Sequence, residues 1–157
     1  MPIVLEGWHI EVPVTALPGY FIADTPWAGR KTQVTSAQRN QSSALLGGGQ
    51  YYSGAPAQNM ETYDDHWFAT GTYKTALLHI TGPSVGIYHV TLDGGSNDFG
   101  TIDGYGAGTT NNIYSEITGV AVTAGLKTFG WKMKTKNASA TNYQMDVLNS
   151  AAARTGA

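Results

Sequence analysis

The stretch GIYHVTLDGGSNDFGTIDGYGAG, residues 86–108, joins an alternating segment to a run rich in glycine and aspartate. The pair Asp93-Gly94, where the alternation stops, is typical of a tight hairpin turn. The stretch therefore predicts two strands joined by a hairpin. Its three aspartates also raise the question of a metal or sugar site.

The first half of this stretch has the two-residue period of a strand. Tyr88, Val90 and Leu92 fall on one face of an extended chain, and His89 and Thr91 fall on the other. Such a pattern is typical of a strand in an antiparallel sheet that buries one face and exposes the other. We therefore expect His89 and Thr91 to face water.

The same period recurs along the chain. It is clear in LKTFGWKMKTK, residues 126–136, and in NYQMDVLN, residues 142–149. Segments rich in glycine, serine and asparagine separate the later candidate strands about every ten residues, which predicts an antiparallel sandwich or barrel. The remaining strand candidates are VLEGWHIEVPV (4–14), GTYKTALLHIT (71–81), FGTIDGY (99–105) and NIYSEITGVAV (112–122).

Residues 24–66 show little periodicity, although Ser36 to Leu46 is compatible with a short helix that Gly47 would stop. We interpret residues 1–66 as an N-terminal strand and an irregular arm that makes assembly contacts, and residues 67–157 as the main domain. The alternative is that the N-terminal segment completes the same sandwich within one chain.

The composition excludes several kinds of function. The net charge is −2 and only 13% of residues are charged, so nothing indicates a nucleic-acid partner. Cysteine is absent, which excludes disulfides and thiolate chemistry and suits folding in a reducing cytosol. No apolar run reaches about 18 residues, so no membrane span is expected.

Metal and catalytic sites have weak signals. The spacing of Asp93, Asp98 and Asp103 does not match a calcium-binding loop, and a structural hairpin explains these residues more simply. The cluster DDHW, residues 64–67, lacks the further ligands of a zinc site, and the four histidines are scattered. A pair of catalytic carboxylates like that of a glycosidase is not excluded, because spacing along the sequence does not show which carboxylates lie close together in the fold. We predict no catalytic residue, no metal and no cofactor.

Aromatic residues are the main candidates for binding. Tyr88, Trp131 and Tyr143 lie in alternating segments and are expected in the core. Aromatic residues in irregular segments are candidates for a ligand or a neighbouring subunit, with packing inside the chain as the alternative. These are Trp27, Tyr51, Tyr52, Tyr63 and Tyr105.

Residues 67–153 resemble a jelly-roll β-sandwich domain that recurs in tail fibres and other exterior proteins of tailed bacteriophages and is similar in shape to carbohydrate-binding modules. The motifs that carry the resemblance are Gly86-Ile87-Tyr88 leading to Leu92-Asp93-Gly94, Gly100-Thr101-Ile102-Asp103 with Tyr105, Ala124-Gly125 and Lys136-Asn137. Leu126-Lys127-Thr128 departs from the pattern, where a histidine-threonine pair is expected.

The resemblance implies that Asp93, Gly94 and Asp103 belong to a structural hairpin. It also implies a noncatalytic virion protein, assembled in the host cytoplasm, that decorates the capsid or forms part of the tail. Its partners would be the major capsid or tail proteins, and it would form a homotrimer. The competing hypothesis is a module that binds a surface glycan or host receptor, and a third is a glycan hydrolase.

Overall fold

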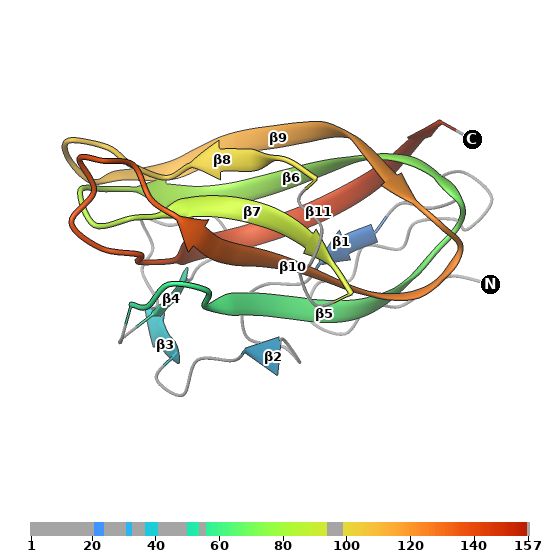
Figure 1. Ribbon diagram of the computed structural model, residues 1–157, viewed down its shortest axis with the longest axis horizontal. Coiled ribbons are helices and arrows are strands. Elements are labelled where there is room, and N and C mark those ends of the chain that lie inside the picture. Colours follow the sequence, from blue (N-terminus) through green and yellow to red (C-terminus); the bar gives the residue numbers. More distant parts are fainter. Residues whose placement is uncertain are drawn as a thin grey trace.

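Two antiparallel β-sheets stacked face to face form the structure (Figure 1). This computed structural model describes residues 21–23, 31–32, 37–40, 50–53, 56–93 and 99–156. No helix is found among them, and so none that could cross a membrane. The predicted all-β, antiparallel jelly-roll sandwich is confirmed. The candidate strand 4–14 and most of the predicted arm lie outside the described residues.

Among the described residues, the first sheet has six strands. Its central strand β11 (Asp146–Gly156) lies between β4 (Gln50–Ser53) and β6 (Gly71–Thr81). The outer strands are β3 (Ala37–Asn40), beside β4, and β9 (Thr110–Val122), beside β6, while β1 (Phe21–Ala23) pairs with β11.

In the part of the chain that the structure describes, the second sheet has five strands, in the order β2 (Lys31–Thr32), β5 (Glu61–Phe68), β10 (Gly125–Thr135), β7 (Ile87–Leu92) and β8 (Thr101–Asp103). β5 runs across the predicted boundary between residues 66 and 67. Strands β1 to β4 come from the predicted arm, and they pair within these two sheets. At least part of that segment therefore completes the sandwich, and its assembly contacts stay a prediction.

The short helix considered for Ser36 to Leu46 does not form over Ala37–Asn40, which is strand β3. This strand pairs residue by residue with β4, from Ala37 opposite Ser53 to Asn40 opposite Gln50. An isolated helix of this length is marginal in water, so pairing with a neighbouring strand overrides a weak local preference.

The core lies between the sheets and is rich in aromatic rings. On β10, Phe129, Trp131 and Met133 are buried, as their alternation predicts. The Trp131 ring meets the rings of Tyr88 and Phe129 edge to face, with centroids 6.5 and 6.1 Å apart. The predicted burial of Tyr88 and Trp131 is confirmed, whereas Tyr143 is half-buried at the margin of the core.

The prediction that His89 and Thr91 face water is wrong, because both are buried although they lie on the outer face of β7. Thr91 donates a hydrogen bond of 2.7 Å to Glu61, across the small residue Gly130 of the intervening strand. His89 contacts the Thr135 hydroxyl at 2.8 Å. Hydrogen bonding among these side chains satisfies polar groups on a face that the alternation assigns to solvent.

Candidate functional site

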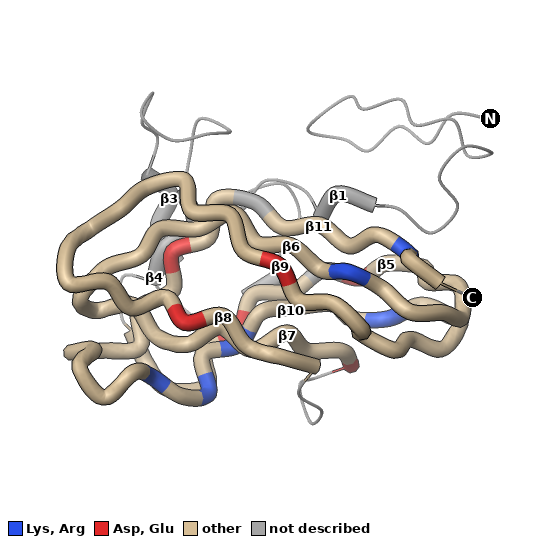
Figure 2. The backbone as a smooth tube through the Cα atoms, turned by 90° about the horizontal axis from the view of Figure 1, so that it is seen from above, with Lys and Arg blue, Asp and Glu red and all other residues tan. Residues whose placement is uncertain are grey.

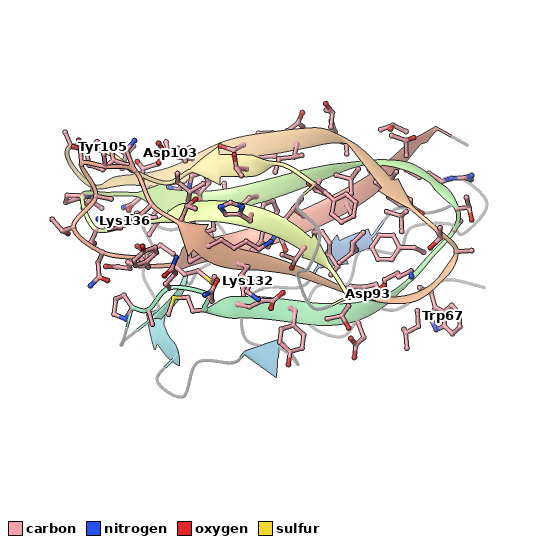
Figure 3. The ribbon with its side chains drawn as sticks, in the orientation of Figure 1. Trp67, Asp93, Asp103, Tyr105, Lys132 and Lys136 are labelled. Carbon is pink, nitrogen blue, oxygen red and sulfur yellow. The ribbon has the colours of Figure 1, made fainter. Side chains whose placement is uncertain are left out.

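An exposed apolar surface lies at one end of the five-stranded sheet. Trp67 on β5 is 77% exposed, and Leu126, directly opposite on β10, is 55% exposed. Paired residues of neighbouring strands project from the same face of a sheet, so these two side chains form one platform. Figure 3 shows Trp67 projecting away from the ribbon at the end where Asp93 also lies.

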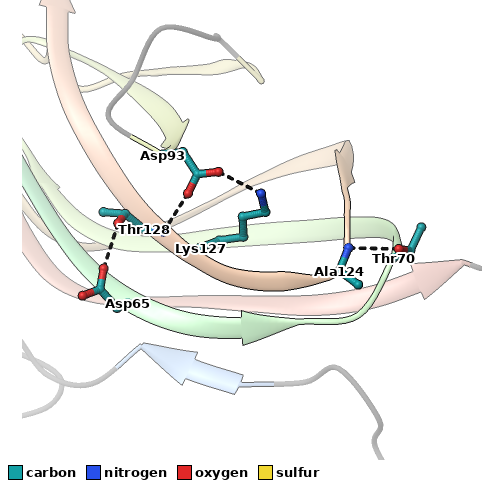
Figure 4. Close-up of polar contacts among 6 residues, drawn as sticks. All are labelled: Asp65, Thr70, Asp93, Ala124, Lys127 and Thr128. Carbon is teal, nitrogen blue, oxygen red and sulfur yellow. Dashed lines mark hydrogen bonds and ion pairs between the residues drawn. The ribbon is translucent and has the colours of Figure 1, made fainter.

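Two carboxylates lie at the same end of the sheet as this platform, and Thr128 joins them (Figure 4). The Thr128 hydroxyl donates to Asp65 Oδ1 at 2.8 Å, and the Thr128 amide donates to Asp93 Oδ1 at 3.1 Å. Lys127 Nζ forms an ion pair with Asp93 Oδ2 at 2.9 Å. We call Asp65, Trp67, Asp93, Leu126, Lys127 and Thr128 the Trp67 site.

Local backbone structure holds the site in place. Asp93 has φ of +51°, a left-handed conformation that aspartate tolerates in turns, and its amide donates to the Thr128 carbonyl at 2.8 Å. The Thr70 hydroxyl accepts a hydrogen bond of 2.9 Å from the Ala124 amide, which ties the turn after β5 to the turn before β10 (Figure 4). The strands that carry Trp67 and Leu126 are thus linked at their ends as well as along their length.

The Asp93 carboxyl group carries a negative charge at neutral pH, because its surroundings favour the ionised form. The hydrogen bond from Lys127, with a smaller contribution from the Thr128 amide, lowers the pKa of Asp93, and partial desolvation opposes this only in part. Asp93 is therefore ionised at neutral pH and acts only as an acceptor. A carboxyl group with a lowered pKa is poorly suited to donate a proton as a general acid.

Asp103 and Tyr105 lie at the opposite end of the sandwich (Figure 3). Both Asp103 oxygens are occupied, Oδ1 by the Tyr105 amide at 2.9 Å and Oδ2 by the Asn137 side chain at 2.7 Å. At Gly104 a Cβ atom would lie 2.4 Å from a Val85 methyl carbon, so this turn requires glycine. Asp103 thus ties two loops together, and half-buried Tyr105 packs beside it.

The structure does not bring the three aspartates of the quoted stretch to one ion. Asp103 pairs with Ile87 at the start of β7, whereas Asp93 follows the end of that strand, about 20 Å away at the rise of an extended chain. Asp98 and Gly94 lie outside the described residues. In the described ranges, no group of three or more histidine, aspartate and glutamate residues is placed to hold a metal.

The predicted aromatic residues are dispersed. Tyr105 lies at the far end, Trp27 lies outside the described residues, and Tyr51 and Tyr52 are in β4, beside the start of β11. Tyr63 is half-buried on β5 and shares a face with Trp67, four residues further along.

Sequence reasoning did not select Trp67 and Leu126 as candidates for binding, although the structure places both at the surface. The available signal was the alternation Tyr63, Asp65, Trp67, which places an aromatic residue, a carboxylate and another aromatic residue on one face of a strand. The pairing of Trp67 with Leu126 depends on the register between β5 and β10, which the sequence alone does not reveal.

No family model matches the sequence, and the search of curated proteins finds no match. Solved structures do match. A xanthan lyase from Paenibacillus aligns with a TM-score of 0.63 and 18% identity over 95% of this chain. The chain spans only 14% of the length of that lyase.

Carbohydrate-binding modules align over most of their own length. The CBM36-1 domain of a multidomain xylanase, from the hindgut metagenome of Trinervitermes trinervoides, has a TM-score of 0.54 and 14% identity, covering 82% of this chain and 100% of that domain. A family 6 module from Clostridium cellulolyticum, solved in complex with xylose, has a TM-score of 0.51 and 17% identity, covering 81% and 96%. At these identities the likeness shows a shared fold: the structural neighbours are jelly-roll β-sandwiches of the carbohydrate-binding-module type.

Proposed function

We propose that the chain is a noncatalytic carbohydrate-binding module that holds its glycan on the Trp67 site. The observation that carries this proposal is the exposure of Trp67 and Leu126 on a rigid sheet face beside two fixed carboxylates. The fold shared with carbohydrate-binding modules supports it, as does the xylose complex of the family 6 module.

The chemistry of the site suits a sugar. One face of a pyranose ring presents C–H groups, which stack against the flat apolar surface of an indole, while hydroxyl groups project around the rim. Asp65 lies two residues from Trp67 on the same face of β5, and Thr128 joins it to Asp93, so both carboxylates would accept hydrogen bonds from such hydroxyls. Because hydrogen bonds within the protein already orient both carboxylates, binding orders few additional side chains.

A hydrolytic role fits the site less well. Glycoside hydrolysis requires one carboxyl group that donates a proton, usually with a raised pKa, opposite a second carboxyl group. Asp93 has a lowered pKa and is held by Lys127 and Thr128. The likeness to xanthan lyase covers a small part of that enzyme, and it supports the fold alone.

The hypothesis of a structural role in a phage particle has less support than that of a carbohydrate-binding module. None of the solved structures named above is described as a phage protein. Capsid decoration, capsid or tail partners, a trimer and a location in the virion therefore stay predictions that no comparison supports.

Affinity electrophoresis tests the proposed function directly. The full chain is run through native gels that contain a neutral polysaccharide such as xylan, a β-glucan or soluble cellulose, or the acidic polysaccharide xanthan. We expect at least one of these to retard the chain, and soluble free oligosaccharide to reverse the retardation. Unchanged mobility in every gel would contradict the proposal.

A further inference from the structure

The edges of the two sheets differ greatly in length. Within the described ranges, the edge strands β1, β2, β3 and β8 have 3, 2, 4 and 3 residues, whereas the edge strand β9 has 13. An edge strand leaves the N–H and C=O groups of alternate residues without a strand partner, and proteins usually keep such strands short. β9 is the long exception, and it runs along one side of the sandwich (Figure 1).

β9 also lacks the residues that normally protect an edge. Its sequence, TNNIYSEITGVAV, contains no lysine, arginine or proline. Its single charge, Glu116, is paired with Lys74 on β6 at 2.9 Å, and Figure 2 shows this strand with little charge along it. Electrostatic repulsion therefore does little to keep a second strand away from this edge.

The middle of β9 is its regular part. The register with β6 shifts between Val120 and Ile117, where Gly119 has φ of +78°, and it shifts again between Ile113 and Thr110. Bulges of this kind twist a strand and disrupt further pairing. The segment Ile113–Ile117 lies between the two irregularities and pairs with β6 without a shift.

This segment is complementary to itself. Antiparallel pairing of Ile-Tyr-Ser-Glu-Ile with a second copy, centred on Ser115, sets Ile113 opposite Ile117 and Tyr114 opposite Glu116. Within one chain the Tyr114 hydroxyl already donates to the Glu116 carboxylate, so the two side chains are chemically matched. The Tyr114 side chain is 60% exposed.

The side chains on each face of Ile113–Ile117 would also be complementary to those of a second copy. Ser115 contacts the core residue His79, and Ile117 is buried, so the isoleucines lie on the inner face of the sheet. Tyr114 and Glu116 then lie on the outer face, because neighbouring residues of a strand alternate. Pairing with a second copy sets isoleucine against isoleucine on one face and tyrosine against glutamate on the other.

We propose that two copies of the chain associate about a two-fold axis by antiparallel pairing of Ile113–Ile117, which joins their six-stranded sheets into one. A five-residue ladder buries less than the roughly 1,200 Å² of total surface typical of stable complexes, so the dimer is weak and depends on concentration. Two-fold pairing closes the assembly at two copies, in contrast to the trimer implied by the phage resemblance.

Sedimentation equilibrium of the full chain, at concentrations up to about 1 mM, tests this proposal because weak association is visible there. We expect the mean mass to rise from that of one chain towards that of two. Tyr114→Glu places like charges opposite each other twice per dimer and should weaken association at least about tenfold. Leu126→Glu removes an exposed apolar side chain elsewhere and should leave association unchanged.

A charge exchange separates edge pairing from misfolding. The double variant Tyr114→Lys with Glu116→Lys should also fail to associate alone, but an equimolar mixture with Tyr114→Glu should form a heterodimer. A wild-type chain that stays monomeric throughout the range would overturn the proposal. Association that persists in Tyr114→Glu, or a mixture of the two variants that stays monomeric, would overturn it as well.

Discussion

Gly130 occupies the centre of β10, where the structure leaves no room for a side chain. A Cβ atom there would lie 2.8 Å from the Thr62 carbonyl oxygen and 3.2 Å from the Thr91 hydroxyl. The first contact is with a backbone atom of the neighbouring strand, which can shift very little to make room. This residue also lets Thr91 reach Glu61 across the strand, so one glycine permits the buried polar face described above.

Gly130→Ala should therefore destabilise the fold by about 1–3 kcal/mol, the usual cost of forcing extra volume into a packed site. Urea denaturation monitored by tryptophan fluorescence measures this change. Gly108→Ala is the matched control, since nothing lies within 4 Å of the added Cβ atom. An equal loss in both variants would show that backbone effects, and not crowding, determine the result.

Asp93 gives a prediction about pH. Its pKa is lowered in the folded chain, so its contribution to stability is complete above the ordinary aspartate pKa of about 3.9 and is lost as pH falls through the lower folded value. The stability difference between the wild type and Asp93→Asn should thus be present at pH 7 and shrink in strong acid. Thermal melts across this range measure it.

A control variant keeps the Asp93 prediction specific. Lys127→Gln removes the partner that contributes most to the lowered pKa, so it should reduce the pH-dependent part of the difference. A difference between the wild type and Asp93→Asn that stays constant from neutral to acid pH would contradict the assigned ion pair.

Two ion pairs, one in each sheet, differ in how far their side chains are buried, so their contributions to stability should differ. Glu61 joins β5 to β10 through Lys132, at 3.5 Å, and its side chain is only 2% exposed. Lys74 joins β6 to β9 through Glu116, and both of these side chains are about one-third exposed. Solvent screens the second pair and leaves the first largely unscreened.

Glu61→Ala should cost about 2–4 kcal/mol, because it leaves Lys132 and Thr91 without their shared acceptor on a buried face. Lys74→Ala should leave the denaturation midpoint nearly unchanged, because water replaces the exposed partner. Comparing the two unfolding curves under identical conditions tests this. A larger loss of unfolding free energy in Lys74→Ala than in Glu61→Ala would contradict the expectation that the buried pair contributes more to stability.

Strand positions were predictable where alternation was strict. The apolar residues of β10 face the core as the sequence indicates, since one buried face requires a period of two. β7 has the same alternation, yet both of its faces are buried, because Glu61 supplies an acceptor from a distant part of the sequence. Ala37–Asn40 was considered compatible with a helix because its pairing partners, ten to sixteen residues further along the chain, are not visible in a local pattern.

Across the full sandwich, the order of strands and the position of the Trp67 site follow from pairings between distant segments. Trp67 and Leu126 meet only because β5 and β10 pair in one register. Sequence reasoning therefore identified the fold class, and it selected other aromatic side chains as candidate binding residues. Tyr105, one of these predicted residues, lies at the end opposite Trp67 (Figure 3).

The proposed function depends on binding of a glycan to Trp67. Isothermal titration with an oligosaccharide of the polysaccharide that best retards the chain tests it most directly, by comparing Trp67→Ala with Tyr114→Ala. Both variants remove an exposed aromatic side chain, but from opposite sheets. We expect Trp67→Ala to weaken binding by about 2 kcal/mol, roughly thirtyfold, and Tyr114→Ala to bind as the wild type does. Equal affinity of Trp67→Ala and the wild type would contradict glycan binding through Trp67.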